Sequence, residues 1–163
     1  MVIKLDLEKL GNYYVWADQK IIQLLEKVSE KEFVQKPSEN LRSMRELAEH
    51  IISSYEFYTV PYNNKKWKEI MDQLQSMTLT ELFSHWKKII TEFNSELGKK
   101  DSNSLFKLST GENKTKDIQE WMNVLLYTDH STYHRGQLIV TYKLVTGNKD
   151  AVATDYYEFL VQV

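Results

Sequence analysis

Apolar residues recur at steps of three and four along much of the chain, the spacing that places side chains on one face of a helix. In the first such segment the periodic positions are Leu10, Tyr14, Ala17, Ile21, Leu24 and Val28. A shorter helix is expected within residues 62–77, and the polar stretch between residues 29 and 40 predicts a connection. Four longer segments with the same pattern predict helices near residues 5–29, 43–60, 78–97 and 117–146.

The predicted helices have recognisable beginnings and ends. In a capping box, a short polar side chain and a carboxylate three residues later satisfy each other's backbone donors. Three of the beginnings fit this pattern: Ser43 with Glu46, Thr78 with Glu81, and Asp117 with Glu120. Gly98 and Gly147 stand where a C-terminal cap is expected. Pro61 disfavours helical backbone at Val60, so the second helix should end there.

The segment before the last long helix predicts a different element. Residues 105–108 read Leu-Phe-Lys-Leu and are followed by a turn around Gly111, which predicts a short hairpin. The four amphipathic helices each need partners for their apolar faces, and a bundle supplies them. We therefore expect an all-α protein, a four-helix up-and-down bundle, with residues 1–163 forming a single domain and a small aromatic tail after residue 148.

Composition and charge exclude several classes of protein. The 163 residues include 21 Lys and Arg against 23 Asp and Glu, and this net charge of -2 argues against a nucleic-acid partner, which normally requires a basic excess. The sequence contains no long apolar run and no signal peptide, so we expect a cytoplasmic protein without a membrane partner. Because there is no Cys, disulfides are excluded, and any thiolate at a metal must come from a substrate.

His130 and His134 are the most informative pair of residues in the sequence. Four apart on a predicted helix, they share one face with Cβ atoms about 5–6 Å apart, so both imidazoles can converge on one metal ion. An apolar stripe from Leu126 to Val145 includes this face, so the pair should point into the bundle. Two hydrogen-bonded core histidines, or a half-exposed pair at a groove, would have the same spacing. A zincin protease is disfavoured, because Ser131 stands where its HExxH motif has Glu.

A third metal ligand should come from a facing helix. His50 is the candidate, because it lies at the border of the buried face of the second helix, next to Ile51. A boundary histidine bonded to a backbone carbonyl or a Tyr would occupy the same position. His85, beside Trp86 on the third long helix, is interpreted as non-ligating.

Three residues that follow the histidine pair carry further hypotheses. Gln137 is placed to form a hydrogen bond beside a metal. Arg135 projects about 100° away from His134 and is interpreted as a structural ion-pair partner rather than a catalyst. A glycine such as Gly136 in mid-helix lowers stability by about 1 kcal/mol relative to Ala. The close approach of another helix or of a ligand would explain its presence, and the alternative is neutral drift.

Four segments resemble the DinB-like (damage-inducible) family of metal-dependent enzymes. The most specific is residues 130–137, His-Ser-Thr-Tyr-His-Arg-Gly-Gln, which is similar to the most distinctive motif of the family. Residues 12–18 look like its first helix, and residues 43–51 look like its first ligand segment. Residues 153–157 resemble its C-terminal segment, with Ala153 at a position where family members often have Pro.

The resemblance implies a four-helix bundle, often a homodimer, with a three-histidine site for a divalent ion such as zinc or nickel. By position, the ligands would be His50, His130 and His134. Relatives of this type include thiol-dependent S-transferases and isomerases that use bacillithiol, mycothiol or glutathione. The implied partners are therefore a small thiol, an electrophile and a second copy of the chain.

Chemistry at such a site leads to one main hypothesis and two alternatives. Three neutral imidazoles leave a divalent ion with open positions, and such an ion deprotonates a coordinating thiol. We therefore expect a metal-dependent enzyme that activates a low-molecular-weight thiol for transfer to an electrophile. One alternative is a hydrolase using metal-bound hydroxide, with Glu46, Glu49 or Asp129 as base. The other is a non-catalytic, metal-stabilised binding protein of the stress response.

Overall fold

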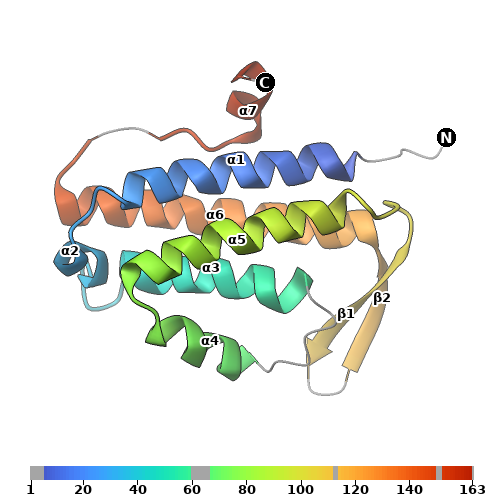
Figure 1. The fold of residues 1–163 in the computed structure, drawn as a ribbon, viewed down its shortest axis with the longest axis horizontal. Coiled ribbons are helices and arrows are strands. Elements are labelled where there is room, and N and C mark those ends of the chain that lie inside the picture. Colours follow the sequence, from blue (N-terminus) through green and yellow to red (C-terminus); the bar gives the residue numbers. More distant parts are fainter. Residues whose placement is uncertain (1–5, 60–66, 112–113, 150–151, 163) are drawn as a thin grey trace.

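The computed structural model describes residues 6–59, 67–111, 114–149 and 152–162 (Figure 1). Four long helices dominate it. The first and the second long helix each pack against both the third and the fourth. This arrangement closes a four-helix bundle. The predicted all-α four-helix fold is thereby confirmed. The helices are α1 (Leu7–Leu25), α3 (Met44–Thr59), α5 (Leu79–Leu97) and α6 (Glu120–Thr146).

The directions of the four helices depart from simple up-and-down alternation. In Figure 1, α3 and α5 run the same way, and α1 and α6 run the opposite way. The cause is α4 (Trp67–Ser76), the short helix predicted within residues 62–77, which packs against α3 and takes the chain back before α5 begins. As a result α6 runs antiparallel to α3, the helix that carries His50.

Three smaller elements complete the described chain. The predicted connection after α1 contains a short helix, α2 (Glu30–Val34), because Ser29 and Glu32 form a capping box and Phe33 is buried. The predicted hairpin is present as β1 (Leu105–Gly111) and β2 (Lys114–Gln119), which pair antiparallel. In the tail, α7 (Tyr156–Gln162) buries Phe159 and contacts α1.

Most predicted helix ends agree with the structure. The backbone N–H of Ser43 donates to the Glu46 carboxylate at 2.7 Å, and the Glu46 N–H donates to the Ser43 hydroxyl at 3.2 Å. Thr78 and Glu81 form the same box at the start of α5. Gly147 ends α6 with a left-handed φ of 70°, a conformation that glycine adopts without a steric penalty. The end predicted at residue 60 lies outside the described residues.

The predicted capping box at Asp117 is wrong. Asp117 lies in β2 opposite Lys107, and its carboxylate is 3.2 Å from the Lys107 ammonium. Strand pairing therefore continues to Gln119, and α6 begins only at Glu120, whose backbone N–H donates to the Ser104 carbonyl at 2.8 Å. The residue before β1 thus accepts the first free N–H of α6, and a local sequence pattern cannot reveal such a distant partner.

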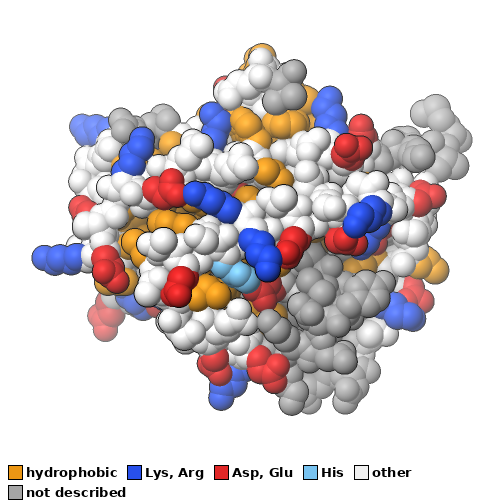
Figure 2. Space-filling model, in the orientation of Figure 1, with side chains coloured by type: hydrophobic (Ala, Val, Ile, Leu, Met, Phe, Trp, Pro, Cys, Tyr) orange, Lys and Arg blue, Asp and Glu red, His pale blue; other side chains and the backbone are white. Residues whose placement is uncertain are grey.

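Large side chains from all four long helices fill the interior of the bundle. Trp86, Tyr13, Tyr14 and Tyr55 are among the fully buried ones. On the face drawn in Figure 2, acidic and basic side chains are interspersed, in keeping with the small net charge of -2. None of the helices in the described part of the chain combines the length and apolar composition that a membrane span needs.

Candidate metal centre

Three histidines from two antiparallel helices meet at one point of the bundle. The rings of His130 and His134 on α6 have centroids 4.4 Å apart, as the four-residue spacing predicts. The ring of His50 on α3 lies 5.2 Å from that of His130 and 4.4 Å from that of His134. One nitrogen from each ring can be chosen so that all three lie within 4.8 Å of one another.

The cluster lies at the boundary between the core and the surface. His134 is buried, with 6% of its area exposed, whereas His50 and His130 are partly exposed. The Trp67 ring stands edge-on to His50 at 5.9 Å, and the Tyr133 ring stands edge-on to His134 at 5.0 Å. The cluster is therefore flanked by two aromatic rings, and His50 and His130 remain reachable by a small molecule.

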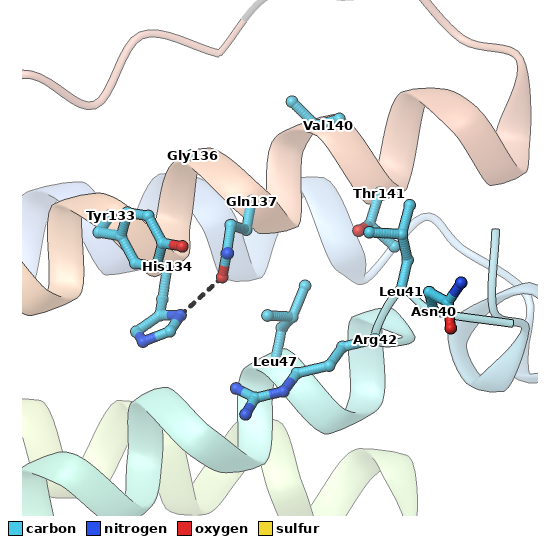
Figure 3. A pocket seen from close by; sticks show the side chains of 10 residues that line it. All are labelled: Asn40, Leu41, Arg42, Leu47, Tyr133, His134, Gly136, Gln137, Val140 and Thr141. Atoms are coloured by element: carbon cyan, nitrogen blue, oxygen red, sulfur yellow. Dashed lines mark hydrogen bonds between the residues drawn. The ribbon is translucent and has the colours of Figure 1, made fainter. Parts of the chain in front are cut away.

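Two polar side chains hold the rings in place. The Nδ1 atom of His134 is 2.8 Å from the Gln137 side-chain oxygen (Figure 3), so Nδ1 donates and Nε2 is left with a free lone pair. The Ser54 hydroxyl donates to the His50 carbonyl oxygen at 2.8 Å and lies 3.1 Å from Nε2 of His130. The predicted role of Gln137 beside the cluster agrees with this geometry. Sequence reasoning missed Ser54, although its position one helical turn after His50 was a signal.

The surroundings favour the neutral form of all three imidazoles. The pKa of His50 is lowered to about 4, mainly by burial and further by the charges of His134 and Arg42. Burial also lowers the pKa of His130 and of His134, and in each case the charge of Arg42 acts in the same direction. Metal binding requires neutral imidazole, so the nitrogens are prepared to ligate at neutral pH.

The donor set suits a divalent transition ion. Three imidazole nitrogens are the ligands of known catalytic zinc sites that keep a fourth position open. In the described part of the chain, no carboxylate belongs to the cluster, and the sequence has no thiolate to offer. The hard ions calcium and magnesium require oxygen ligands and do not fit this set.

Other candidates from the sequence lie outside the cluster. His85 on α5 pairs with the buried carboxylate of Glu56, in keeping with its interpretation as non-ligating. Of the three bases considered for a hydrolase, Glu46 caps α3 and pairs with Lys36 at 2.9 Å, and Glu49 pairs with Arg45 at 2.7 Å. The third, Asp129, is an exposed residue whose charge raises the pKa of His130.

The face assigned to α6 from sequence is partly wrong. Leu126 was placed on the buried stripe, but 48% of its area is exposed. The buried face instead includes Arg135, which pairs with Asp18 at 3.0 Å, so its predicted role in a structural ion pair is confirmed. No described atom comes within 4 Å of a Cβ built on Gly136, so none of the described helices approaches it closely.

A cavity of about 700 Å³ opens beside His134 (Figure 3). It lies between α6 and the segment that leads into α3. Sequence reasoning missed Asn40, Leu41 and Arg42 as site residues, because they lie between the predicted polar connection and the second long helix, where no periodic pattern marks them. The described residues that line the cavity are Asn40, Leu41, Arg42, Leu47, Tyr133, His134, Gly136, Gln137, Val140 and Thr141.

Comparison with family models gives a match that spans nearly the whole chain. The model described as the DinB family covers residues 1–158. This range includes all three clustered histidines, the cavity and the four long helices. A comparison with curated proteins gives no match. The family expected from the sequence is thereby confirmed, and together with the cluster it fits a metal-binding enzyme.

Proposed function

The chain belongs to the DinB family, and on this basis we propose that it is a metal-dependent enzyme that activates a small thiol for transfer to an electrophile. The observation that carries the proposal is the three-histidine cluster, whose candidate ligand atoms lie within 4.8 Å of one another beside a cavity of about 700 Å³. A purely structural metal site would not need such a cavity, which falls in the size range of small-molecule sites.

In this proposal His50, His130 and His134 hold one zinc or nickel ion. Bound there, the ion supplies open coordination positions and favours the thiolate over the thiol. Gln137 keeps the Nδ1 proton on His134 and thereby leaves Nε2 free for the ion. Because the chain has no Cys, no thiolate of its own competes with the substrate.

The cavity beside His134 provides room for both reactants. Leu41, Leu47 and Val140 give it apolar wall, which limits access of water to the sulfur. The thiol loses its proton to solvent, and the sulfur forms a bond to the electrophilic carbon. The leaving group of the electrophile departs with the electron pair of its bond.

Cobalt substitution tests the proposal directly. Titration of the cobalt-loaded protein with small thiols should give a sulfur-to-metal charge-transfer band, which should disappear in His130→Ala. The matched control is His85→Ala, which removes a histidine already paired with Glu56 and should keep the band. A band retained in His130→Ala but lost in His85→Ala would refute the ligand set. Ester or amide cleavage without any thiol band would replace the transferase with a hydrolase, and a loaded protein with neither response would be a structural metal protein.

We further propose that the protein is a homodimer that associates through α6. The support is an apolar face of this helix that the described residues leave uncovered. Sedimentation at micromolar concentration should give a dimer mass, and Leu126→Glu should give a monomer. Leu105→Glu, which adds the same charge at a 73%-exposed position on β1, should not dissociate the dimer. The exposed residues of this face are Met122, Leu125, Leu126, Tyr133, Val140 and Leu144.

A further inference from the structure

Arg42 brings an unneutralised positive charge to the cavity beside His134. Among the ten described residues that line the cavity, it is the one Lys or Arg, and none is Asp or Glu. Figure 3 shows its side chain crossing the cavity below Leu47, with the guanidinium directed toward the His134 side. The cavity therefore has a permanent cation in its wall, on the side of the histidine cluster.

No acidic side chain in the described part of the chain pairs with Arg42. None of the ion pairs between described residues includes it. The nearby carboxylates on α3 are engaged elsewhere, since Glu46 pairs with Lys36 and Glu49 with Arg45. The five N–H donors of the guanidinium thus remain available for a planar oxyanion.

The charge of Arg42 reaches the histidine cluster. It lowers the pKa of His50, of His130 and of His134, although burial has the larger effect on each. The three imidazoles are neutral ligands and would not cancel the charge of a divalent ion. An ion in the cluster and Arg42 together make this end of the cavity strongly positive. A substrate with one anionic group would therefore leave either the ion or Arg42 without a negative partner.

We propose that Arg42 forms an oxyanion subsite that selects substrates carrying a carboxylate at some distance from the reacting thiol. This inference rests on the proposed function, because it places the substrate sulfur at the histidine cluster. The carboxylate binds the guanidinium in the bidentate manner that Arg favours. Leu41, Leu47 and Val140 contact the aliphatic part between the two anionic groups.

Two small thiols separate the role of Arg42 from that of the metal. With the cobalt-loaded protein, the affinity for 3-mercaptopropionate and for 2-mercaptoethanol is measured from the charge-transfer band. Arg42→Gln should weaken binding of the carboxylated thiol about tenfold and leave the neutral thiol within about twofold, the size expected for a lost charge-assisted hydrogen bond. Arg42→Lys should recover part of the loss, because it keeps the charge without the planar fork.

The matched control is Lys88→Gln, which removes one positive charge at an exposed ion pair with Glu92 outside the cavity lining. It should change neither affinity. Equal weakening of both thiols by Arg42→Gln, or weakening of neither, would overturn the subsite. If no thiol gives a band in the wild type, the proposed function fails, and calorimetry with succinate then tests the subsite alone. Succinate binding that Arg42→Gln abolishes would support it, and no binding would overturn it.

Discussion

His134 and Arg135 are neighbours in the sequence, yet they belong to two polar regions of opposite kind. The Arg135 side chain is fully buried, with one terminal nitrogen 3.0 Å from the Asp18 carboxylate and the other 3.0 Å from the Tyr13 hydroxyl. Asp18 in turn accepts a hydrogen bond from Trp86 at 2.9 Å. The imidazole of His134 instead leaves one nitrogen free, next to two other histidines and a cavity. One region uses its polar groups to fix the bundle, and the other keeps them available for a ligand.

The first prediction concerns the buried ion pair of Arg135 and Asp18, which with Tyr13 and Trp86 forms the fixed region of the bundle. Asp18→Ala leaves the Arg135 guanidinium buried without its carboxylate, and removing one partner of a buried ion pair costs about 3–5 kcal/mol. Urea unfolding of the metal-free protein measures the loss. Glu26→Ala is the control, because it removes an exposed partner of Lys87 and should cost less than about 1 kcal/mol. Equal costs in the two variants would mean that the Asp18 pair does not hold the bundle together.

The second prediction concerns the ligand-binding region. Gln137→Ala removes the acceptor that holds the Nδ1 proton of His134, so zinc affinity should fall about 10–100-fold, as for other outer partners of metal ligands. A competition assay with a chelating dye measures it. Gln137→Glu retains an acceptor and should keep most of the affinity. Because Gln137 is partly exposed, neither variant should change metal-free unfolding by more than about 0.5 kcal/mol. A loss of stability without a loss of affinity would place Gln137 in the fixed region.

Local patterns in the sequence were enough to predict much of the ligand-binding region. The four-residue spacing of His130 and His134 defines their relative position on any α-helix. His50 needed one further assumption, that its helix faces theirs. Ser43 and Thr78 identified two helix starts, because a capping box involves residues only three apart.

Long-range pairing explains what the sequence did not reveal. The burial of Arg135 depends on Asp18, 117 positions away, so a pattern of apolar residues could not place Arg135 on the buried face of α6. Leu126 was placed inside but is exposed. Asp117 fits a helix cap by its local sequence alone, and only the strand pairing with Lys107 shows that it belongs to β2. Arg42 has no local pattern and became visible only through the cavity.

The third prediction uses pH to test the three histidines of the ligand-binding region. The pKa of His50 is lowered to about 4, and those of His130 and His134 are lowered from 6.5. Below pH 6.5 the unfolded chain binds protons at these histidines that the folded chain does not, so the metal-free protein should lose stability as pH falls from 6.5 toward 4. A His50→Gln variant should lose less over this range, as urea midpoints would show. Identical pH profiles for the two proteins would contradict the lowered pKa of His50.

The smallest expected effect comes from two mid-helix glycines, Gly11 on α1 and Gly136 on α6 beside the cavity. A Cβ on Gly11 would lie 2.0 Å from the Asn94 side-chain oxygen, whereas a Cβ on Gly136 meets no described atom within 4 Å. Asn94 also donates to Asn12 at 2.8 Å, so it cannot move away without losing that bond. Gly11→Ala should therefore destabilise the protein, and Gly136→Ala should stabilise it by about 1 kcal/mol through helix propensity alone.

Measuring the two glycine variants at two protein concentrations relates this contrast to the proposed homodimer. In protein dilute enough to dissociate the proposed dimer, the gain from Gly136→Ala should be complete. At concentrations that favour association, the added methyl group would face the second copy if α6 forms the interface, and the gain should shrink. Unfolding midpoints that show a loss of stability in the dilute sample would contradict the open surroundings of Gly136. A gain independent of concentration would place Gly136 outside the interface and leave the cavity as its neighbour.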